Sequence, residues 1–144
     1  MTAESDKIVQ AGAIGTGDYA TAIVTQAEHI PNLNVSIVAD MNIDAAHRAF
    51  QLAGIDESQI VVASTHAEAL AGIEAGKKVA VSDGTLLMDL PLDVIVEGTG
   101  SPTAGAVHAA TALRNGKHVV MVTKETEVVV GTLLRRIAKE NDTV

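Results

Sequence analysis

A short glycine-rich segment near the N-terminus has the residue types and spacing of a turn that grips phosphate. Residues 15–20 (GTGDYA) fit the pattern G-x-G-x-x-[GA] and follow an apolar run. In such a turn the first glycine, here Gly15, permits a tight bend, and the second, Gly17, lets a pyrophosphate approach the backbone. The small Ala20 allows a helix to pack closely on the preceding strand. The segment therefore predicts a dinucleotide-binding turn between a strand and a helix.

Other residues of this segment are expected to complete the binding loop. Thr16, Asp18 and Tyr19 lie within the pattern and are candidate cofactor contacts. Gly12 lies earlier, on the expected strand, where a missing side chain would help the pyrophosphate to approach. The pattern contains no G-K-[ST] after its glycines, which excludes a Walker A loop.

An acidic residue follows at the distance that dinucleotide-binding turns require. Asp40 lies about twenty residues after Ala20 and ends a second apolar run, where a carboxylate accepts hydrogen bonds from the adenosine ribose hydroxyls. Asp40 would repel a 2′-phosphate, and the first basic residue after it is Arg48. The expected cofactor is NAD or NADP, with NAD favoured. Two alternatives stay open: a purely structural turn in which Asp40 caps a loop, and a methyltransferase that binds S-adenosylmethionine.

Two further loops carry residues suited to the same site. Residues 97–102 (EGTGSP) follow an apolar run, and Gly98, Thr99, Gly100 and Pro102 are candidate cofactor contacts. Because ligands of open α/β sheets bind outside the carboxyl ends of the strands, this loop should face the cofactor. The alternative is a plain capped loop.

The last of these loops lies at the end of a further apolar run. Thr123 is a candidate cofactor contact, and Lys124 is a candidate catalytic residue placed to meet nicotinamide or a substrate oxygen. The alternative for Lys124 is an ordinary solvated loop lysine.

Hydrophobic periodicity predicts the elements that would position these loops. Expected strands lie at residues 7–14, 34–40, 59–63, 78–82, 92–96 and 117–123, and expected helices at 18–29, 44–54, 65–75, 101–115 and 125–140. A turn is expected at residues 83–84. This alternation predicts an α/β fold: a doubly wound, mostly parallel sheet in a three-layer αβα arrangement. The chain ends on a helix, where such a domain would normally add another strand.

Composition narrows the class of protein. Hydrophobic residues make up 47% of the 144 residues and aromatic residues only 1%, so the core must be aliphatic and base-stacking modules are disfavoured. The net charge of −8 disfavours nucleic acid and anionic membranes as partners. Cysteine is absent, and no apolar run is long enough to span a membrane. The start of the chain lacks a signal-peptide pattern, so a cytoplasmic protein is expected.

The histidines give no sign of a metal site. They share no metal-ligand spacing and are expected on the surface or in packing; they are His29, His47, His66, His108 and His118. We therefore expect no bound metal.

With these loops in view, the chain resembles the cofactor domain of homoserine dehydrogenases, in the branch that includes 1-deoxy-D-xylulose 5-phosphate reductoisomerase-like proteins. The resemblance runs from residue 7 to about residue 141. It is carried by AGAIGTGDYATAIVTQ, by IVADMNIDAA and by the segment from DVIVEGTGSP to KHVVMVTKETEVVVG. Homoserine dehydrogenases have V-T-A-N-K at the last strand end; its Lys falls on Lys124 and its Asn on Thr123.

The resemblance implies NAD(P)-dependent hydride transfer involving a small hydroxy, carbonyl or phosphorylated substrate. It also implies a C-terminal substrate domain outside residues 1–144, a homo-oligomeric full-length protein and an inactive isolated cofactor domain. A nucleotide-sensing module without catalysis is the alternative; Lys124 and residues 99–102 favour the enzyme, since a sensor needs only the first turn.

Overall fold

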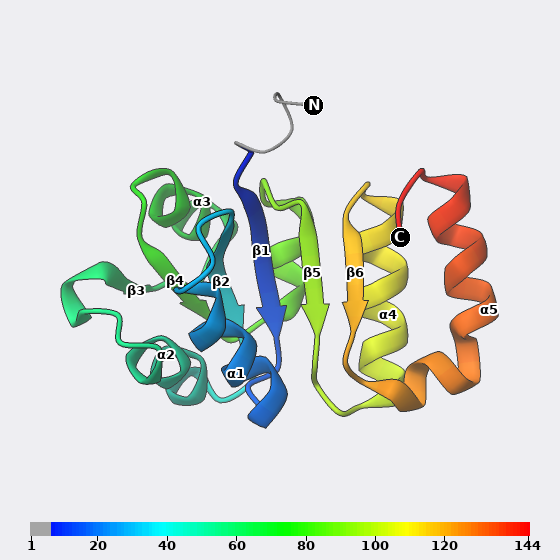
Figure 1. Ribbon diagram of the computed structural model, residues 1–144, viewed down its shortest axis with the longest axis horizontal. Coiled ribbons are helices and arrows are strands. Elements are labelled where there is room, and N and C mark those ends of the chain that lie inside the picture. The colour runs from blue at the N-terminus through cyan, green and yellow to red at the C-terminus, as the bar shows by residue number, and fades with distance from the viewer. Residues whose placement is uncertain (1–6) are drawn as a thin grey trace.

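The structure, a computed structural model, describes residues 7–144; the polar lead at residues 1–6 lies outside the described residues. Its centre is a six-stranded sheet in which all neighbouring strands run parallel, in the order β3-β4-β2-β1-β5-β6 (Figure 1). The strands are β1 (Val9–Ile14), β2 (Leu33–Ala39), β3 (Ile60–Val62), β4 (Lys78–Val81), β5 (Val94–Glu97) and β6 (His118–Met121). In a parallel sheet the loops that follow the strands share one edge, and they can form one site there.

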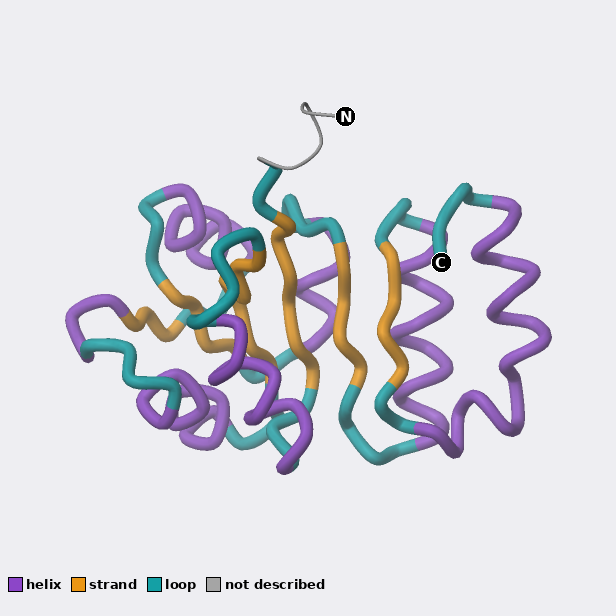
Figure 2. Tube along the Cα trace, in the orientation of Figure 1, coloured by secondary structure: helices purple, strands orange, loops and turns teal. Residues whose placement is uncertain are grey.

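Helices cover both faces of this sheet (Figure 2). They are α1 (Asp18–Ala27), α2 (Ile43–Leu52), α3 (His66–Glu74), α4 (Pro102–Arg114) and α5 (Lys124–Glu140), with short 3₁₀ helices η1 (Glu57–Gln59) and η2 (Gly84–Asp89). One buried cluster joins α1 and α2 to one face, and a second joins α3, η2 and α4 to the other. Helix α5 packs on α4 through a third cluster. The predicted doubly wound, three-layer fold is confirmed.

Local sequence signals account for several element ends. The side chain of Thr65 accepts a hydrogen bond from Glu68 N, and the side chain of Glu68 accepts one from Thr65 N. These two bonds form a capping box at the start of α3. Ser101 caps α4, and Pro102 is its first residue. Gly116, beyond the end of α4, has a φ of +74°, the left-handed conformation typical of a helix C-terminus. Each of these helix ends follows from a single residue and its neighbours.

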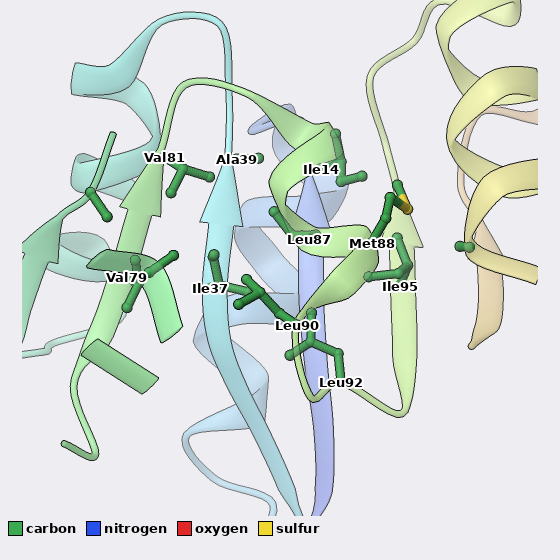
Figure 3. Close-up of a cluster of buried hydrophobic side chains, with 13 residues drawn as sticks. Ile14, Ile37, Ala39, Val79, Val81, Leu87, Met88, Leu90, Leu92 and Ile95 are labelled. Carbon is green, nitrogen blue, oxygen red and sulfur yellow. The ribbon is translucent and has the colours of Figure 1, made fainter. Parts of the chain in front are cut away.

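The segment between β4 and β5 corrects one expectation. The predicted turn at residues 83–84 opens η2, which packs over β1 and β2 with Leu87, while Leu92 follows beside it (Figure 3). A Cβ on Gly12 would lie 2.7 Å from Leu87 Cδ2 and 2.9 Å from Leu92 Cδ1. Gly12 is therefore a packing residue that lets η2 approach the sheet, and not the expected aid to pyrophosphate approach.

The strand order places a switch point beside β1. From β1 the chain continues through α1 to β2 on one side, whereas β5, on the other side of β1, is reached only after β4. Crevices at such switch points bind ligands in open α/β sheets. Within residues 7–144 no helix is long and apolar enough to cross a membrane.

Candidate functional site

The turn from β1 into α1 has the shape that its glycines predict. Gly15 has a φ of +91°, and a Cβ there would lie 2.6 Å from the carbonyl carbon of Gly98 and 2.8 Å from Thr99 N. Only glycine therefore fits where the β1 loop meets the β5 loop. Gly17 has an ordinary φ of −64°, and nothing lies within 4 Å of a Cβ built on it. The space above Gly17 is open to a ligand.

The N-terminus of α1 faces this open space without a side-chain cap. Gly17 occupies the N-cap position and makes no side-chain hydrogen bond to the helix. Backbone N–H groups at a helix start, together with the helix dipole, form an anion-binding site. The first turn of α1 can therefore receive the pyrophosphate of a dinucleotide.

Asp40 accepts three hydrogen bonds, and the two from Thr16 hold it against this turn. Its Oδ2 accepts from Thr16 N at 3.0 Å and from Thr16 Oγ1 at 2.6 Å, and its Oδ1 accepts from Asn42 N at 2.8 Å. The carboxylate is half-buried at the end of β2. A carboxylate offers about four lone-pair sites, so one remains for a ribose hydroxyl. Thr16 thus serves first to orient Asp40.

The loop after β5 is organised by a buried acid that was not among the predicted site residues. Glu97 is 0% exposed, and its Oε1 accepts from Thr99 N at 3.2 Å and from Thr99 Oγ1 at 2.6 Å. The Nδ1 atom of His108 lies 3.6 Å from the same oxygen. Burial alone would raise the pKa of Glu97, but the neighbouring polar side chains of His108, Thr123 and Thr99 outweigh burial and hold that pKa below its ordinary value. Glu97 is therefore ionised at neutral pH.

The end of β6 closes the site on the other side. Thr123 is buried, and its Oγ1 accepts from Gly100 N at 3.1 Å, so it ties the β5 and β6 loops together. Lys124 is exposed and is the first residue of α5, one residue before the expected start of that helix.

Two adjoining clefts lie along these loops and share Gly17, Gly98 and Gly100. The larger has a volume of about 890 Å³. Its lining includes Thr16, Asp40, Met41, residues 82–84, Thr99, Ser101, Ala104 and His108. The smaller, of about 540 Å³, is lined by residues 17–20, Val122, Thr123, Lys124 and Glu125. A ligand with two halves joined at Gly17 fits this arrangement.

The predicted site residues are brought together, with two exceptions. Lining one cleft or both are Gly15, Thr16, Gly17, Asp18, Tyr19, Asp40, Gly98, Thr99, Gly100, Thr123 and Lys124. Gly12 lies in the core, as described above. Pro102 lines neither cleft: it starts α4, and its carbonyl accepts from Thr126 Oγ1 at 3.1 Å. A proline lacks an N–H to offer a phosphate, so its place at the helix start explains it better than cofactor contact does.

Sequence reasoning missed Glu97, His108 and the loop at residues 82–84. A weak signal existed for Glu97, because it directly follows the apolar strand expected at residues 92–96. An acid that is buried in such a place is normally paired with another polar group. No signal existed for His108, whose neighbours are set by how α4 crosses β5.

A parallel sheet with a switch point at β1, a glycine turn into an uncapped helix and an acid after β2 define a dinucleotide-binding Rossmann domain. The chain belongs to the family described as the NAD-binding domain of homoserine dehydrogenase, whose model matches residues 11–143. This places it among the NAD(P)-binding domains of oxidoreductases and confirms the resemblance, the cofactor class and the broad function predicted from sequence.

Individual proteins agree with this assignment. The chain is 30% identical over 114 residues to 1-deoxy-D-xylulose 5-phosphate reductoisomerase of Chlorobium phaeobacteroides, covering 79% of this chain and 25% of that protein. Its fold is similar to a homoserine dehydrogenase from Thiobacillus denitrificans (TM-score 0.67, 23% identity, 95% of this chain and 28% of that one). It is also similar to a probable dehydrogenase from Thermotoga maritima (TM-score 0.67, 15% identity, 94% and 34%). The chain spans about a quarter to a third of the length of these proteins.

Proposed function

We propose that residues 7–144 hold NAD or NADP across the two clefts, as the cofactor-binding part of a homoserine dehydrogenase-like oxidoreductase. The observation that carries this proposal is the turn at Gly15 and Gly17. Its backbone is fixed by a glycine-only contact, and it opens on an uncapped helix start beside the carboxylate of Asp40. That combination supplies an anion site and a ribose acceptor in one place.

Each part of the cofactor has a matching group in the chain. The pyrophosphate would lie on the first turn of α1, and the adenosine ribose would bond to Asp40 in the larger cleft. The nicotinamide end would then lie in the smaller cleft, between Tyr19 and Thr123. Tyr19 is 76% exposed, so its ring is free to cover a ligand there.

Lys124 is the candidate catalytic residue of this arrangement. Its position at the start of α5 borders the smaller cleft, where an ammonium group would stabilise negative charge that develops on a substrate oxygen. When bound, the nicotinamide supplies the hydride chemistry itself. The role of the chain is to orient that ring and to place a cation beside the reacting oxygen.

The substrate and much of the catalytic machinery would come from a domain beyond residues 1–144. This proposal is supported by the share of the related proteins that the chain covers, a quarter to a third. The isolated 144 residues should therefore bind cofactor without turning over L-homoserine. Turnover by the purified chain, at a rate that scales with protein concentration, would overthrow this part of the proposal.

Calorimetry tests the cofactor proposal directly. The chain is titrated in turn with NAD, NADP and S-adenosylmethionine, while circular dichroism confirms that it is folded. Binding of NAD or NADP, with no heat from S-adenosylmethionine, is the expected result. Binding of S-adenosylmethionine alone would make the protein a methyltransferase, and no binding of any ligand by the folded chain would refute the site.

A further inference from the structure

The carboxylate of Glu97 lies beneath α4, close to Gly105 and His108 of that helix. A Cβ on Gly105 would lie 2.9 Å from Glu97 Oε2, so glycine at this position lets α4 pass directly over the carboxylate. His108 follows one helical turn later on the same helix. Its Nδ1, like Glu97 Oε2, is buried and without a hydrogen-bond partner among the described residues. A buried carboxylate in this state needs a counter-charge.

His108 is the only ion-pair partner of Glu97 within residues 7–144, at 3.6 Å from Nδ1 to Oε1. This separation is longer than a hydrogen bond but within reach of an ion pair. Within residues 7–144 His108 forms no ion pair other than that with Glu97, and α5 presents the uncharged Thr126 to Gly105. On η2, the cap Asp83 is engaged by Thr85, at 2.8 Å to its N and 2.7 Å to its Oγ1. Glu97 therefore places its carboxylate beside the imidazole ring of His108.

The other side of the imidazole ring faces the larger cleft. His108 lines that cleft, its side chain is 15% exposed, and a Cβ on Gly84 would lie 3.4 Å from its Nε2. The charged residues that line the cleft are otherwise Asp40 and Asp83, and no Lys or Arg of the described chain lines it. His108 is thus the one side chain able to give this cleft a positive charge.

We infer that Glu97 and His108 form a buried acid–base pair that supplies the cofactor cleft with its cation, so that protonated His108 attracts the diphosphate of a bound dinucleotide. The inference rests on the proposed function, because it requires the larger cleft to hold that ligand. His108 is the ligand-facing member, and Glu97 is a positioning residue that acts through it. Since only the protonated ring carries charge, the affinity for a diphosphate ligand falls as pH rises and His108 loses its proton.

The test measures the dissociation constant of NAD by calorimetry at intervals from pH 6 to pH 8.5. Histidines change charge in this range, so wild-type affinity is expected to weaken as pH rises. The variant His108→Gln should bind about tenfold more weakly at pH 6 and lose most of the pH dependence. Glu97→Gln should also flatten the profile, because His108 then lacks its carboxylate partner. His47→Gln, on α2 and paired with Glu57 outside both clefts, is the matched control and should retain the wild-type profile.

Two further ligands separate attraction of the diphosphate from a general effect on the loops. ADP-ribose carries the diphosphate and should show the same pH dependence as NAD, whereas adenosine lacks it and should show none. Equal profiles for wild type and His108→Gln, with both folded by circular dichroism, would refute the pair. An equal slope with adenosine would refute the contact with diphosphate. Failure of the proposed function looks different: wild type would then bind NAD at no pH.

Discussion

The two halves of the site repeat one arrangement with opposite exposure. Each has a Gly-Thr-Gly loop, and in each the threonine donates both its N–H and its hydroxyl to a carboxylate: Thr16 to Asp40 and Thr99 to Glu97, with both hydroxyl bonds at 2.6 Å. Asp40 comes from the neighbouring strand and borders the open cleft, whereas Glu97 ends its own strand and is fully buried. Asp40 is thus available to a ligand, whereas Glu97 holds the conformation of its own loop.

The loops also meet each other through backbone. The open side of Gly15 is filled by the carbonyl of Gly98, so the conformation of one loop limits that of the other. Rigid support of this kind fixes a binding group more accurately than an isolated loop does. The comparison therefore predicts that changes in the buried half act on stability first, and changes in the open half act on ligand affinity first.

The largest expected effect is at the contact between the two loops. Gly15→Ala would place a methyl group against the Gly98 backbone at a φ of +91°, and it should cost at least about 2 kcal/mol in the free energy of unfolding. Gly17→Ala is the matched control: its Cβ points into open space at an ordinary φ, so stability should change by less than about 1 kcal/mol. NAD binding should nevertheless weaken in Gly17→Ala, because the methyl group occupies the ligand's space. Urea denaturation and calorimetry measure both, and equal stabilities of the two variants would contradict the role of Gly15.

The next effect distinguishes Glu97 from Asp40 by the pH dependence of stability. The pKa of Glu97 in the folded state is lowered, so its contribution to stability is complete above its ordinary pKa and is lost as pH falls through the lowered value. Glu97→Gln should cost about 2 kcal/mol at pH 7 and make stability less dependent on pH between about 5 and 3. Glu74→Gln, at an exposed position of α3, is the control and should retain the wild-type pH profile. Parallel acid-denaturation curves for wild type and Glu97→Gln would show that this carboxylate is not specially stabilised.

The third effect concerns the ligand-facing acid. Asp40→Ala should weaken NAD binding about tenfold, since hydrogen bonds to a charged acceptor contribute about 1.5–3 kcal/mol. NADP should lose less affinity, because the same change removes the repulsion between Asp40 and the 2′-phosphate. Calorimetry with both cofactors measures the difference, and an equal loss for the two would contradict the proposed contact with ribose.

How much of this site could be predicted from sequence differs between the halves for a physical reason. The first half depends on local sequence: Gly15 and Gly17 predict the turn, and Asp40 follows at the spacing set by one helix and one strand. The second half depends on tertiary packing. That Gly105 clears a path for α4 over Glu97, and that Gly12 makes room for Leu87, are contacts between segments far apart in the chain. Periodicity predicts that such segments are buried, but it carries no information about which residue meets which.

The smallest effect tests the repeat itself by removing one hydroxyl from each half. Thr99→Val takes a donor from a buried carboxylate that no water replaces, and it also removes the acceptor for Ser101 N at 3.2 Å, so it should cost about 1–2 kcal/mol. Thr16→Val removes an equally short bond, but Asp40 is half-buried and water can take the place of the hydroxyl, so the loss should stay near 0.5 kcal/mol. Both substitutions remove an equally short bond to a carboxylate, so the expected difference comes from the burial of Glu97 and from the additional contact with Ser101 N. Urea denaturation of both variants measures that difference. Equal losses would mean that the burial of the carboxylate does not affect how much its threonine contributes to stability.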